Sequence, residues 1–364
     1  MNYHSDVIGS LLRPPYLIEA REQLETGRIS PAEFKRIEDR AVDDVVSLQE
    51  ASGVEVITDG EMRRYAFWSH LTDALEGYDK TGGWGLPFRD EKDEEYILKR
   101  PVVVEKLRPK RNMCAEEFIY LRARAKRPIK ATFLSVMQAA AYYDVEKSGG
   151  AYPTREAYLA DIVDYTRREV EELIRLGCTY IQVDGPQYAG LADPKIREGY
   201  LKRGGDPDKL LDAAIEADNA VVDGHSSDVT FALHICRGNV RSKWYVSGGY
   251  DPIAAKVFRD THFQRFLLEY DDMRSGTFEP LKEMPEDRSV VLGLISSKKP
   301  NLEPTDELKE RIDEAARLVP LERLALSPQC GFATVLEGNK ITLEDQQRKL
   351  ELTARVAGEV WGSA

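Results

Sequence analysis

Three residues with metal-binding side chains fall at the ends of two apolar segments of the chain. His234 and Cys236 end the run 229–236, and Cys330 closely follows the run 324–327. Because side chains two positions apart on a strand point to the same side, His234 and Cys236 can reach one ion. Imidazole and thiolate ligands select zinc over magnesium or calcium. The three residues therefore predict a zinc site.

A carboxylate lies between these residues in chain order. Glu269 falls near the end of the apolar run 266–270, and Asp271 and Asp272 follow that run. Zinc held by two thiolates and one carboxylate has a net negative charge, so it activates water less than zinc held by three neutral histidines. It can instead hold a substrate thiol as a nucleophilic thiolate, with Glu269 as the ligand that the thiol displaces. The ligand set favours alkylation of a thiol over hydrolysis.

The other two cysteines are expected to have a structural role. Cys114 and Cys178 each stand alone in the sequence. A lone cysteine is usually a small buried apolar residue. Four scattered cysteines also do not make a disulfide framework.

Small and acidic residues lie at the ends of three further apolar runs. Ile8-Gly9-Ser10 offers backbone groups and a hydroxyl, whereas Asp59, Glu61 and Asp184 offer carboxylates. Carboxylates pair with ammonium groups, although acids at such positions also serve as helix caps or solvated loop residues. Beside a zinc-bound sulfur, these groups suit an amino-acid thiol as the substrate.

The elements that position these residues repeat as an apolar run followed by a helical pattern. Apolar residues at helical spacing predict helices over 31–52, 154–176 and 306–318. Strands that alternate with helices form a parallel sheet, and eight of them close into a (β/α)8 TIM barrel with its active site at the carboxyl ends of the strands. The eight predicted strands are 6–10, 54–61, 129–133, 180–184, 229–234, 266–270, 290–295 and 324–327.

One segment does not fit this repeat. Residues 71–127 are too long for one helix and contain a glycine-rich stretch at 82–87 and an apolar run at 101–104. We interpret them as an insertion between the second and third strands, with a hairpin followed by a helix near 115–125. The chain, residues 1–364, is predicted to form a single barrel. No G-x-G-x-x-G follows the first strand and no P-loop motif occurs, which disfavours a doubly wound nucleotide-binding fold.

The composition disfavours several other classes of protein. The chain has 364 residues, and 51 Lys+Arg against 63 Asp+Glu give a net charge of −12. This acidity disfavours nucleic acid as a partner. No stretch approaches the ~20 apolar residues of a membrane-spanning helix, and the first six residues lack the features of a signal peptide. We therefore expect a cytoplasmic enzyme with no membrane partner.

Several of these fragments together resemble the catalytic domain of cobalamin-independent methionine synthase. The resemblance covers nearly the whole chain and is carried by Ile8-Gly9-Ser10-Leu11-Leu12-Arg13-Pro14, Asp59-Gly60-Glu61-Met62-Arg63-Arg64, Gln182-Val183-Asp184-Gly185-Pro186, His234-Ile235-Cys236 and Pro328-Gln329-Cys330-Gly331. It implies zinc as the cofactor, a methylated folate as methyl donor and homocysteine as acceptor. The zinc ligands that it implies are His234, Cys236, Glu269 and Cys330. The residues that it implies for binding the amino and carboxylate groups of homocysteine are Ile8, Gly9, Ser10, Glu61 and Asp184, with Glu269 and Asp184 as catalytic residues.

Two departures from the family concern the methyl donor. The full synthase carries two barrels, whereas this chain has room for the catalytic one, so half of the folate-docking surface is absent. Ser296, which we expect to contact the substrate, replaces a histidine that helps to protonate the departing pterin nitrogen. A serine hydroxyl does not donate a proton in this way near neutral pH. Lys298 or Lys299 can substitute, although lysines at such positions are more often solvated. Trp68 and Trp84 offer a flat wall for a pterin, or ordinary packing.

Three functions remain open at this point. The first is a zinc-dependent methyltransferase that converts homocysteine to methionine. The second keeps the zinc–thiolate step with another thiol or alkyl donor, as in epoxyalkane:coenzyme M transferase, although coenzyme M has a sulfonate and no amine, so Glu61 and Asp184 would match it poorly. The third is a barrel that binds zinc and a thiol without catalysis. The methyl donor, the pathway and the oligomeric state, including a homo-oligomer, are left undecided.

Overall fold

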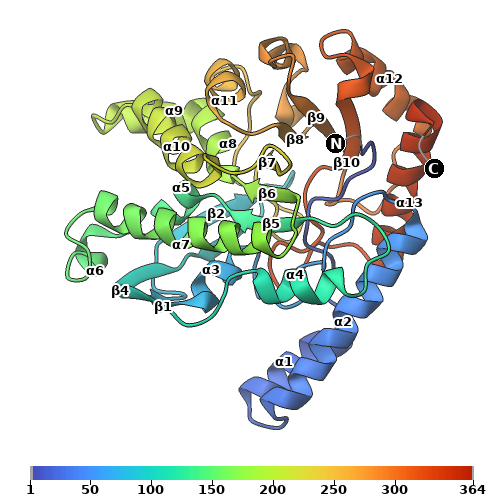
Figure 1. Cartoon of the computed structure of the whole chain (residues 1–364). Coiled ribbons are helices and arrows are strands. Elements are labelled where there is room, and N and C mark those ends of the chain that lie inside the picture. Colours follow the sequence, from blue (N-terminus) through green and yellow to red (C-terminus); the bar gives the residue numbers. More distant parts are fainter. Residues whose placement is uncertain (1–2, 363–364) are drawn as a thin grey trace.

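The centre of the molecule is a parallel sheet, seen in the computed structural model, which describes residues 3–362 (Figure 1). Its six strands are hydrogen-bonded in the order β10-β9-β8-β7-β6-β5, and all neighbours are parallel. Each strand lies within two residues of a predicted one. The bounds are β5 Ala131–Leu134, β6 Tyr180–Asp184, β7 Thr230–Ile235, β8 Arg265–Glu269, β9 Ser289–Ile295 and β10 Leu324–Pro328.

Two extended segments complete the ring at the edges of this sheet. Ser5 forms a parallel bridge to Leu326 of β10, and Ile57 forms one to Ile129, just before β5. Between the two segments, Thr58 Oγ1 donates to Gly9 O at 2.9 Å. The α/β fold with a (β/α)8 barrel is thus confirmed.

The first two predicted strands, 6–10 and 54–61, differ from the prediction. Each forms a single bridge rather than a regular strand. The physical reason is that side chains replace backbone ladder bonds where the two segments meet. Ser5 N donates to the Glu55 carboxylate at 2.9 Å, and Glu55 N donates to Ser5 Oγ at 2.9 Å.

The barrel interior is filled by one apolar layer and one charged layer. The apolar layer consists of Ile8, Val56, Tyr180, Ala232, Leu267, Val291 and Ala325. The charged layer is built on Lys130 Nζ, which lies 2.7 Å from Asp6 Oδ1 and 2.7 Å from Gln182 Oε1. Asp6 also accepts from Tyr180 Oη at 2.7 Å and lies 3.5 Å from Arg265 Nε. Lys130 and Asp6 are both fully buried and form an ion pair, so each neutralises the charge of the other away from water.

Helices surround the barrel and end at residues that the sequence marks. The helix α2, Pro31–Ser52, begins with a capping box between Ser30 and Glu33 and ends at Gly53, whose φ is +85°. Thr154 caps α7, Arg155–Arg175. The other helices are α1 Pro15–Glu25, α3 Ser69–Ala74, α4 Ala115–Arg122, α5 Val136–Ala140, α6 Val145–Ser148, α8 Pro186–Ala192, α9 Pro194–Lys202, α10 Pro207–Val222, α11 Ala254–Asp260, α12 Thr305–Ala316 and α13 Leu343–Trp361.

Residues 75–109 hold four short antiparallel strands. They are β1 Leu75–Asp79, β2 Gly85–Arg89, β3 Glu95–Lys99 and β4 Val102–Pro109, with β1 paired to β4 and β2 to β3. The β2–β3 hairpin is fastened to the loop after β7, because Arg89 and Trp244 exchange two backbone hydrogen bonds and Lys243 pairs with Asp90. This loop is thereby tied to the hairpin.

None of the helices within residues 3–362 has both the length and the apolar content needed to cross a bilayer.

Candidate active site and metal centre

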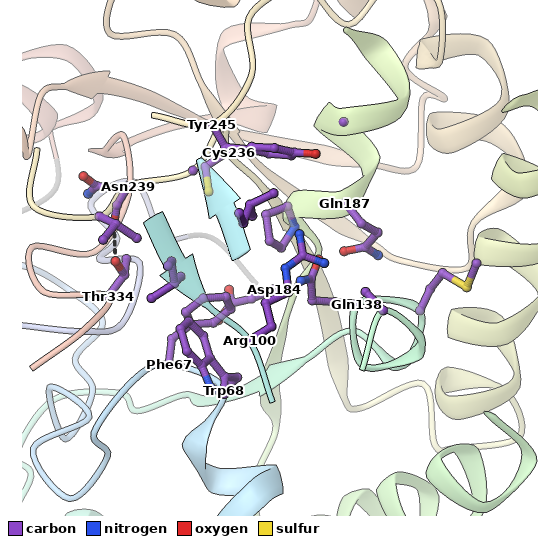
Figure 2. Close-up of a pocket in the computed structure, with 18 of the residues that line it drawn as sticks. Phe67, Trp68, Arg100, Gln138, Asp184, Gln187, Cys236, Asn239, Tyr245 and Thr334 are labelled. Carbon is purple, nitrogen blue, oxygen red and sulfur yellow. Dashed lines mark hydrogen bonds between the residues drawn. The ribbon is translucent and has the colours of Figure 1, made fainter. Parts of the chain in front are cut away.

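A cavity of about 250 Å³ opens at the carboxyl ends of the barrel strands. Figure 2 shows Cys236 and Tyr245 on one side of it, Phe67 and Trp68 on another, and Asp184 and Arg100 near one another between them. Most of the sequence-predicted site residues line this one cavity. They are Ile8, Gly9, Ser10, Glu61, Asp184, His234, Cys236 and Cys330.

The predicted metal ligands at the ends of β7 and β10 converge. Within residues 3–362, His234, Cys236 and Cys330 form a buried group whose ligand atoms all lie within 4.8 Å of one another. His234 Nδ1 lies 3.1 Å from Leu267 O, so Nδ1 carries the hydrogen and Nε2 has the lone pair that can bind a metal. His234 Nε2 is buried and has no hydrogen-bond partner in the described chain. One imidazole nitrogen and two sulfurs, held in this way, fit a zinc ion.

The two thiols differ in their tendency to ionise. A hydrogen bond from Cys330 holds the pKa of Cys236 well below its usual range, and nearby His234 lowers it further. The same hydrogen bond raises the pKa of Cys330, as does its burial. A thiolate is therefore favoured at Cys236, which is the form that binds a metal.

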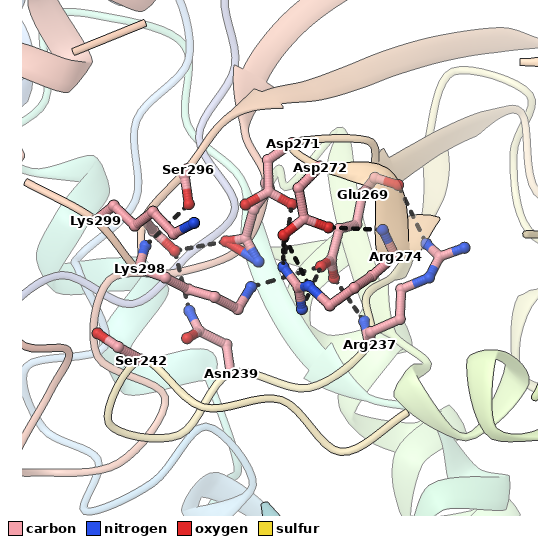
Figure 3. A network of polar contacts seen from close by, with 12 residues as sticks. Arg237, Asn239, Ser242, Glu269, Asp271, Asp272, Arg274, Ser296, Lys298 and Lys299 are labelled. Carbon is pink, nitrogen blue, oxygen red and sulfur yellow. Dashed lines mark hydrogen bonds and ion pairs between the residues drawn. The ribbon is translucent and has the colours of Figure 1, made fainter. Parts of the chain in front are cut away.

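Glu269, the predicted fourth ligand, lies next to this group but outside it. Its carboxylate accepts from Arg237 N at 2.6 Å and lies 3.5 Å from Lys298 Nζ and 3.8 Å from Arg274 Nη1 (Figure 3). Burial raises the pKa of Glu269, but Lys298, Arg237 and Arg274 outweigh it and hold the pKa below its ordinary value. The carboxylate is thus ionised and engaged by cations.

Lys298 and Lys299 have opposite environments. The expectation that both lysines are solvated is wrong for Lys298, which is 5% exposed, because the buried carboxylate of Glu269 draws it inward. Lys299 is exposed and pairs with Glu91 at 3.0 Å. Ser296 does not line the cavity. Its backbone N donates to Glu303 at 2.8 Å, and its hydroxyl accepts from Lys298 N at 3.3 Å.

Two buried carboxylates face the cavity near the metal ligands. Glu61 Oε1 accepts from Thr132 Oγ1 at 2.8 Å and lies 3.2 Å from Arg64, while Glu61 Oε2 is buried with no partner among residues 3–362. Asp184 Oδ1 accepts from Gln182 Nε2 at 2.7 Å. Burial raises the pKa of Asp184 to about 7, and the charge of Glu61 adds to this effect. A ligand cation would therefore meet two carboxylates with spare acceptor capacity.

The backbone of residues 8–10 packs closely against these groups. A Cβ atom on Gly9 would lie 2.9 Å from Glu61 Oε1, and a Cβ atom on Gly331 would lie 2.1 Å from Ser10 Oγ. Glycine at both positions lets the chain approach the carboxylate and the hydroxyl. Asp59, in contrast, does not line the cavity, and its Oδ1 accepts from Glu61 N at 2.9 Å.

Sequence reasoning missed several residues of this site. Arg64 and Thr132 hold Glu61, and Arg100 and Gln187 line the outer part of the cavity. Arg64 lies in a fragment that already carries the family resemblance, which is a usable signal. Arg100 has none, because it is an isolated arginine before Pro101 in a segment without helical or strand periodicity.

A family model described as "Cobalamin-independent synthase, Catalytic domain" matches residues 4–347. The chain belongs to this family.

Several known proteins are similar to the chain over most of its length. It is 35% identical to "Uncharacterized protein YxjH" of Bacillus subtilis (strain 168), over 99% of this chain and 95% of that protein. It is 26% identical to "Methionine synthase" of Pyrococcus abyssi, over 90% and 86%. The crystal structure of a putative vitamin-B12 independent methionine synthase from Listeria monocytogenes is similar at a TM-score of 0.76 and 28% identity, over 99% and 98%. This structural similarity supports the barrel fold.

Proposed function

We propose that the protein is a zinc-dependent methyltransferase that converts homocysteine to methionine. One observation carries the proposal: a nitrogen and two thiols lie within 4.8 Å of one another in a cavity that also holds two buried carboxylates. This combination matches a substrate with both a sulfur and an ammonium group. The single barrel of 1–364, with 71–127 as an insertion, is part of the proposal.

The carboxylates and the tight backbone turn bind the amino acid. Glu61 Oε2 has no partner in the described chain, so it can accept from the substrate ammonium together with Asp184. Gly9 and Ser10 offer backbone and hydroxyl groups to the substrate carboxylate. Because Thr132 and Arg64 already fix Glu61, little side-chain entropy is lost when substrate binds.

His234, Cys236 and Cys330 would hold the zinc ion, with Glu269 as the proposed fourth ligand, whose place the substrate sulfur would take. Zinc in this ligand set stabilises a bound thiolate that remains nucleophilic. The Glu269 carboxylate would keep its negative charge on release from the ion, because Lys298, the backbone N of Arg237 and Arg274 surround it. In the transfer, a bond forms between sulfur and the methyl carbon, and the bond from that carbon to the donor breaks with its electron pair left on the donor.

A panel of methyl donors tests this function. Zinc-loaded protein is incubated with homocysteine and, separately, 5-methyltetrahydrofolate, methylcobalamin and S-methylmethionine, and methionine formation is measured. We expect methionine from one donor, and none from the Cys236→Ser variant, which removes a ligand but keeps the cavity shape. Tight homocysteine binding without methionine from any donor would favour a thiol-binding barrel without catalysis. Replacing homocysteine with coenzyme M tests the other thiol, and we expect no product because Glu61 and Asp184 repel a sulfonate.

A further inference from the structure

The outer part of the cavity contains a buried cation that no acidic group pairs with. Arg100 is 8% exposed and lines the cavity (Figure 2). No carboxylate oxygen within residues 3–362 lies within 4.0 Å of its guanidinium. The titratable groups that act on Arg100 in the described chain are the hydroxyls of Tyr142, Tyr200 and Tyr245. Burial lowers the pKa of Arg100, as expected for a cation without a counter-ion.

The other buried arginines show that this situation is exceptional in the molecule. Arg64 pairs with Glu117 at 2.7 Å, Arg63 with Asp39 at 2.5 Å, and Arg265 lies 3.5 Å from Asp6. Arg13 and Arg237 donate to backbone carbonyls. An unpaired buried charge is costly. Arg100 therefore has the environment of a binding residue rather than of a structural ion pair.

The geometry of Arg100 leaves its donors available. Its guanidinium lies over the ring of Trp84, 4.0 Å from the ring centroid. A stacked guanidinium has one covered face, while its N–H groups point outward in the plane, where they can bind a carboxylate or phosphate with two parallel hydrogen bonds. A second cation, Arg155, also lines the cavity and is exposed.

A neutral acceptor is fixed in the same cavity. Gln187 Nε2 donates to Ser135 Oγ at 2.6 Å, and Ser135 Oγ donates to Asp218 at 2.8 Å. Because this chain fixes the amide orientation, Gln187 Oε1 is left without a partner in the described structure. The apolar walls of this cavity include Trp68 and Tyr245.

We propose that Arg100 binds an anionic group of the methyl donor, and that Gln187 accepts a hydrogen bond from an N–H group of the same molecule. The donor is then an anion, carboxylate or phosphate, on an apolar or aromatic body. The proposal rests on the proposed function, since it places the methyl donor beside the thiol pocket.

A direct binding experiment tests the anion site without turnover. Hippurate, an aromatic carboxylate with one N–H group, is compared by calorimetry with hippuramide, which has the same body and no charge, and phenyl phosphate distinguishes phosphate from carboxylate. We expect hippurate or phenyl phosphate to bind about tenfold to 100-fold more tightly than hippuramide, the range of one charge-assisted pair. Arg100→Met removes this preference, and Arg100→Lys keeps part of it.

The matched control is Arg241→Met. It removes a positive charge that is stacked on Tyr96 of the β2–β3 hairpin and lies outside the cavity lining. It should keep the preference unchanged. Equal binding of the charged and neutral probes by the unmodified protein would overturn the proposal, as would a preference that survives Arg100→Met in a protein with unchanged melting temperature. The binding experiment contains neither zinc nor homocysteine. Its outcome can therefore be interpreted even if the protein fails to transfer a methyl group to homocysteine.

Discussion

The barrel contains two buried polar layers that use similar residues in opposite ways. In the inner layer, Lys130 lies 2.7 Å from both Asp6 and Gln182, and Tyr180 donates to Asp6. The charges of Lys130 and Asp6 are fully buried and paired. At the carboxyl ends of the strands, His234 Nε2 and Glu61 Oε2 are equally buried but have no partner in the described chain.

The difference separates groups that stabilise the fold from groups that bind a ligand. A paired buried charge is satisfied in the free protein, so a ligand gains little from it. An unpartnered buried nitrogen or carboxylate oxygen already bears the cost of desolvation, so a ligand that pairs with it recovers that free energy on binding. The comparison predicts that the inner layer controls the stability of the fold. It also predicts that the outer layer, the unpartnered groups at the carboxyl ends of the strands, controls zinc and substrate binding.

The largest effect is expected from removing both thiols. Cys236→Ser with Cys330→Ser should abolish zinc binding and lower methyl transfer about 10⁴-fold, because hydroxyls do not replace thiolates as zinc ligands. Metal analysis and methionine formation measure the two effects. The fold should persist, since the inner layer is untouched. Full retention of zinc in the double variant would contradict the assignment of the metal site.

The inner layer is tested by removing its cation. Lys130→Met leaves Asp6 buried without its main partner, so the free energy of unfolding should fall by about 3–5 kcal/mol. Urea denaturation measures this change. Lys256→Met breaks the exposed pair with Asp212 and should leave stability nearly unchanged. Zinc content at low temperature should be the same in both variants, and zinc loss in folded Lys130→Met would break the comparison.

The sequence predicted the positions of the metal ligands because they follow local rules. His234 lies at the end of β7 with Cys236 directly after the strand, and Cys330 follows β10, so the strand order of a barrel is enough to bring them together. The helix α2 was predicted at its observed bounds because Ser30 and Pro31 mark its start and apolar residues at helical spacing extend to its end. Local sequence patterns are therefore sufficient to predict the six regular strands and the longest helix.

Local sequence patterns do not predict polar contacts between residues that are far apart in the chain. The sequence around Ser5 and Glu55 predicts two strands, but hydrogen bonds to the side chains of these residues replace the backbone hydrogen bonds of a regular strand pair. Lys298 is buried because Glu269, 29 residues earlier, accepts it at 3.5 Å. Arg100 enters the cavity from the link between β3 and β4, where it belongs to no regular element. The first two cases depend on a partner remote in the sequence, and the third depends on how the whole cavity is assembled. The assignments of individual site residues to zinc or substrate stay predictions.

The carboxylates of the outer layer give the next prediction. Glu61→Gln replaces the unpartnered oxygen by an amide that cannot neutralise an ammonium group. We expect about 30-fold weaker binding of methionine, corresponding to about 2 kcal/mol, with zinc content unchanged. Calorimetric titration measures the affinity. Glu38→Gln is a control, since Glu38 is another mostly buried acid beside arginines but does not line the cavity. Equal affinities in the Glu61→Gln and Glu38→Gln variants would contradict the role of Glu61.

The smallest expected effect is the pH dependence of methionine binding through Asp184. Burial raises the pKa of Asp184 from 3.8 to about 7, so the carboxyl group is mostly neutral at pH 6 and mostly ionised at pH 8. Since the ammonium of methionine pairs with the ionised form, binding should strengthen as pH rises through 7, by about tenfold between pH 6 and pH 8.

Methionine has no thiol to deprotonate, so with zinc-loaded protein Asp184 is the group of the pocket expected to titrate in this range. Asp184→Asn should bind methionine weakly and with a nearly flat pH profile. An unchanged tenfold rise in this variant would assign the titration to another group. The inner layer offers the opposite case, because Lys130 lowers the pKa of Asp6 and keeps it ionised, so Asp6 contributes no change between pH 6 and pH 8.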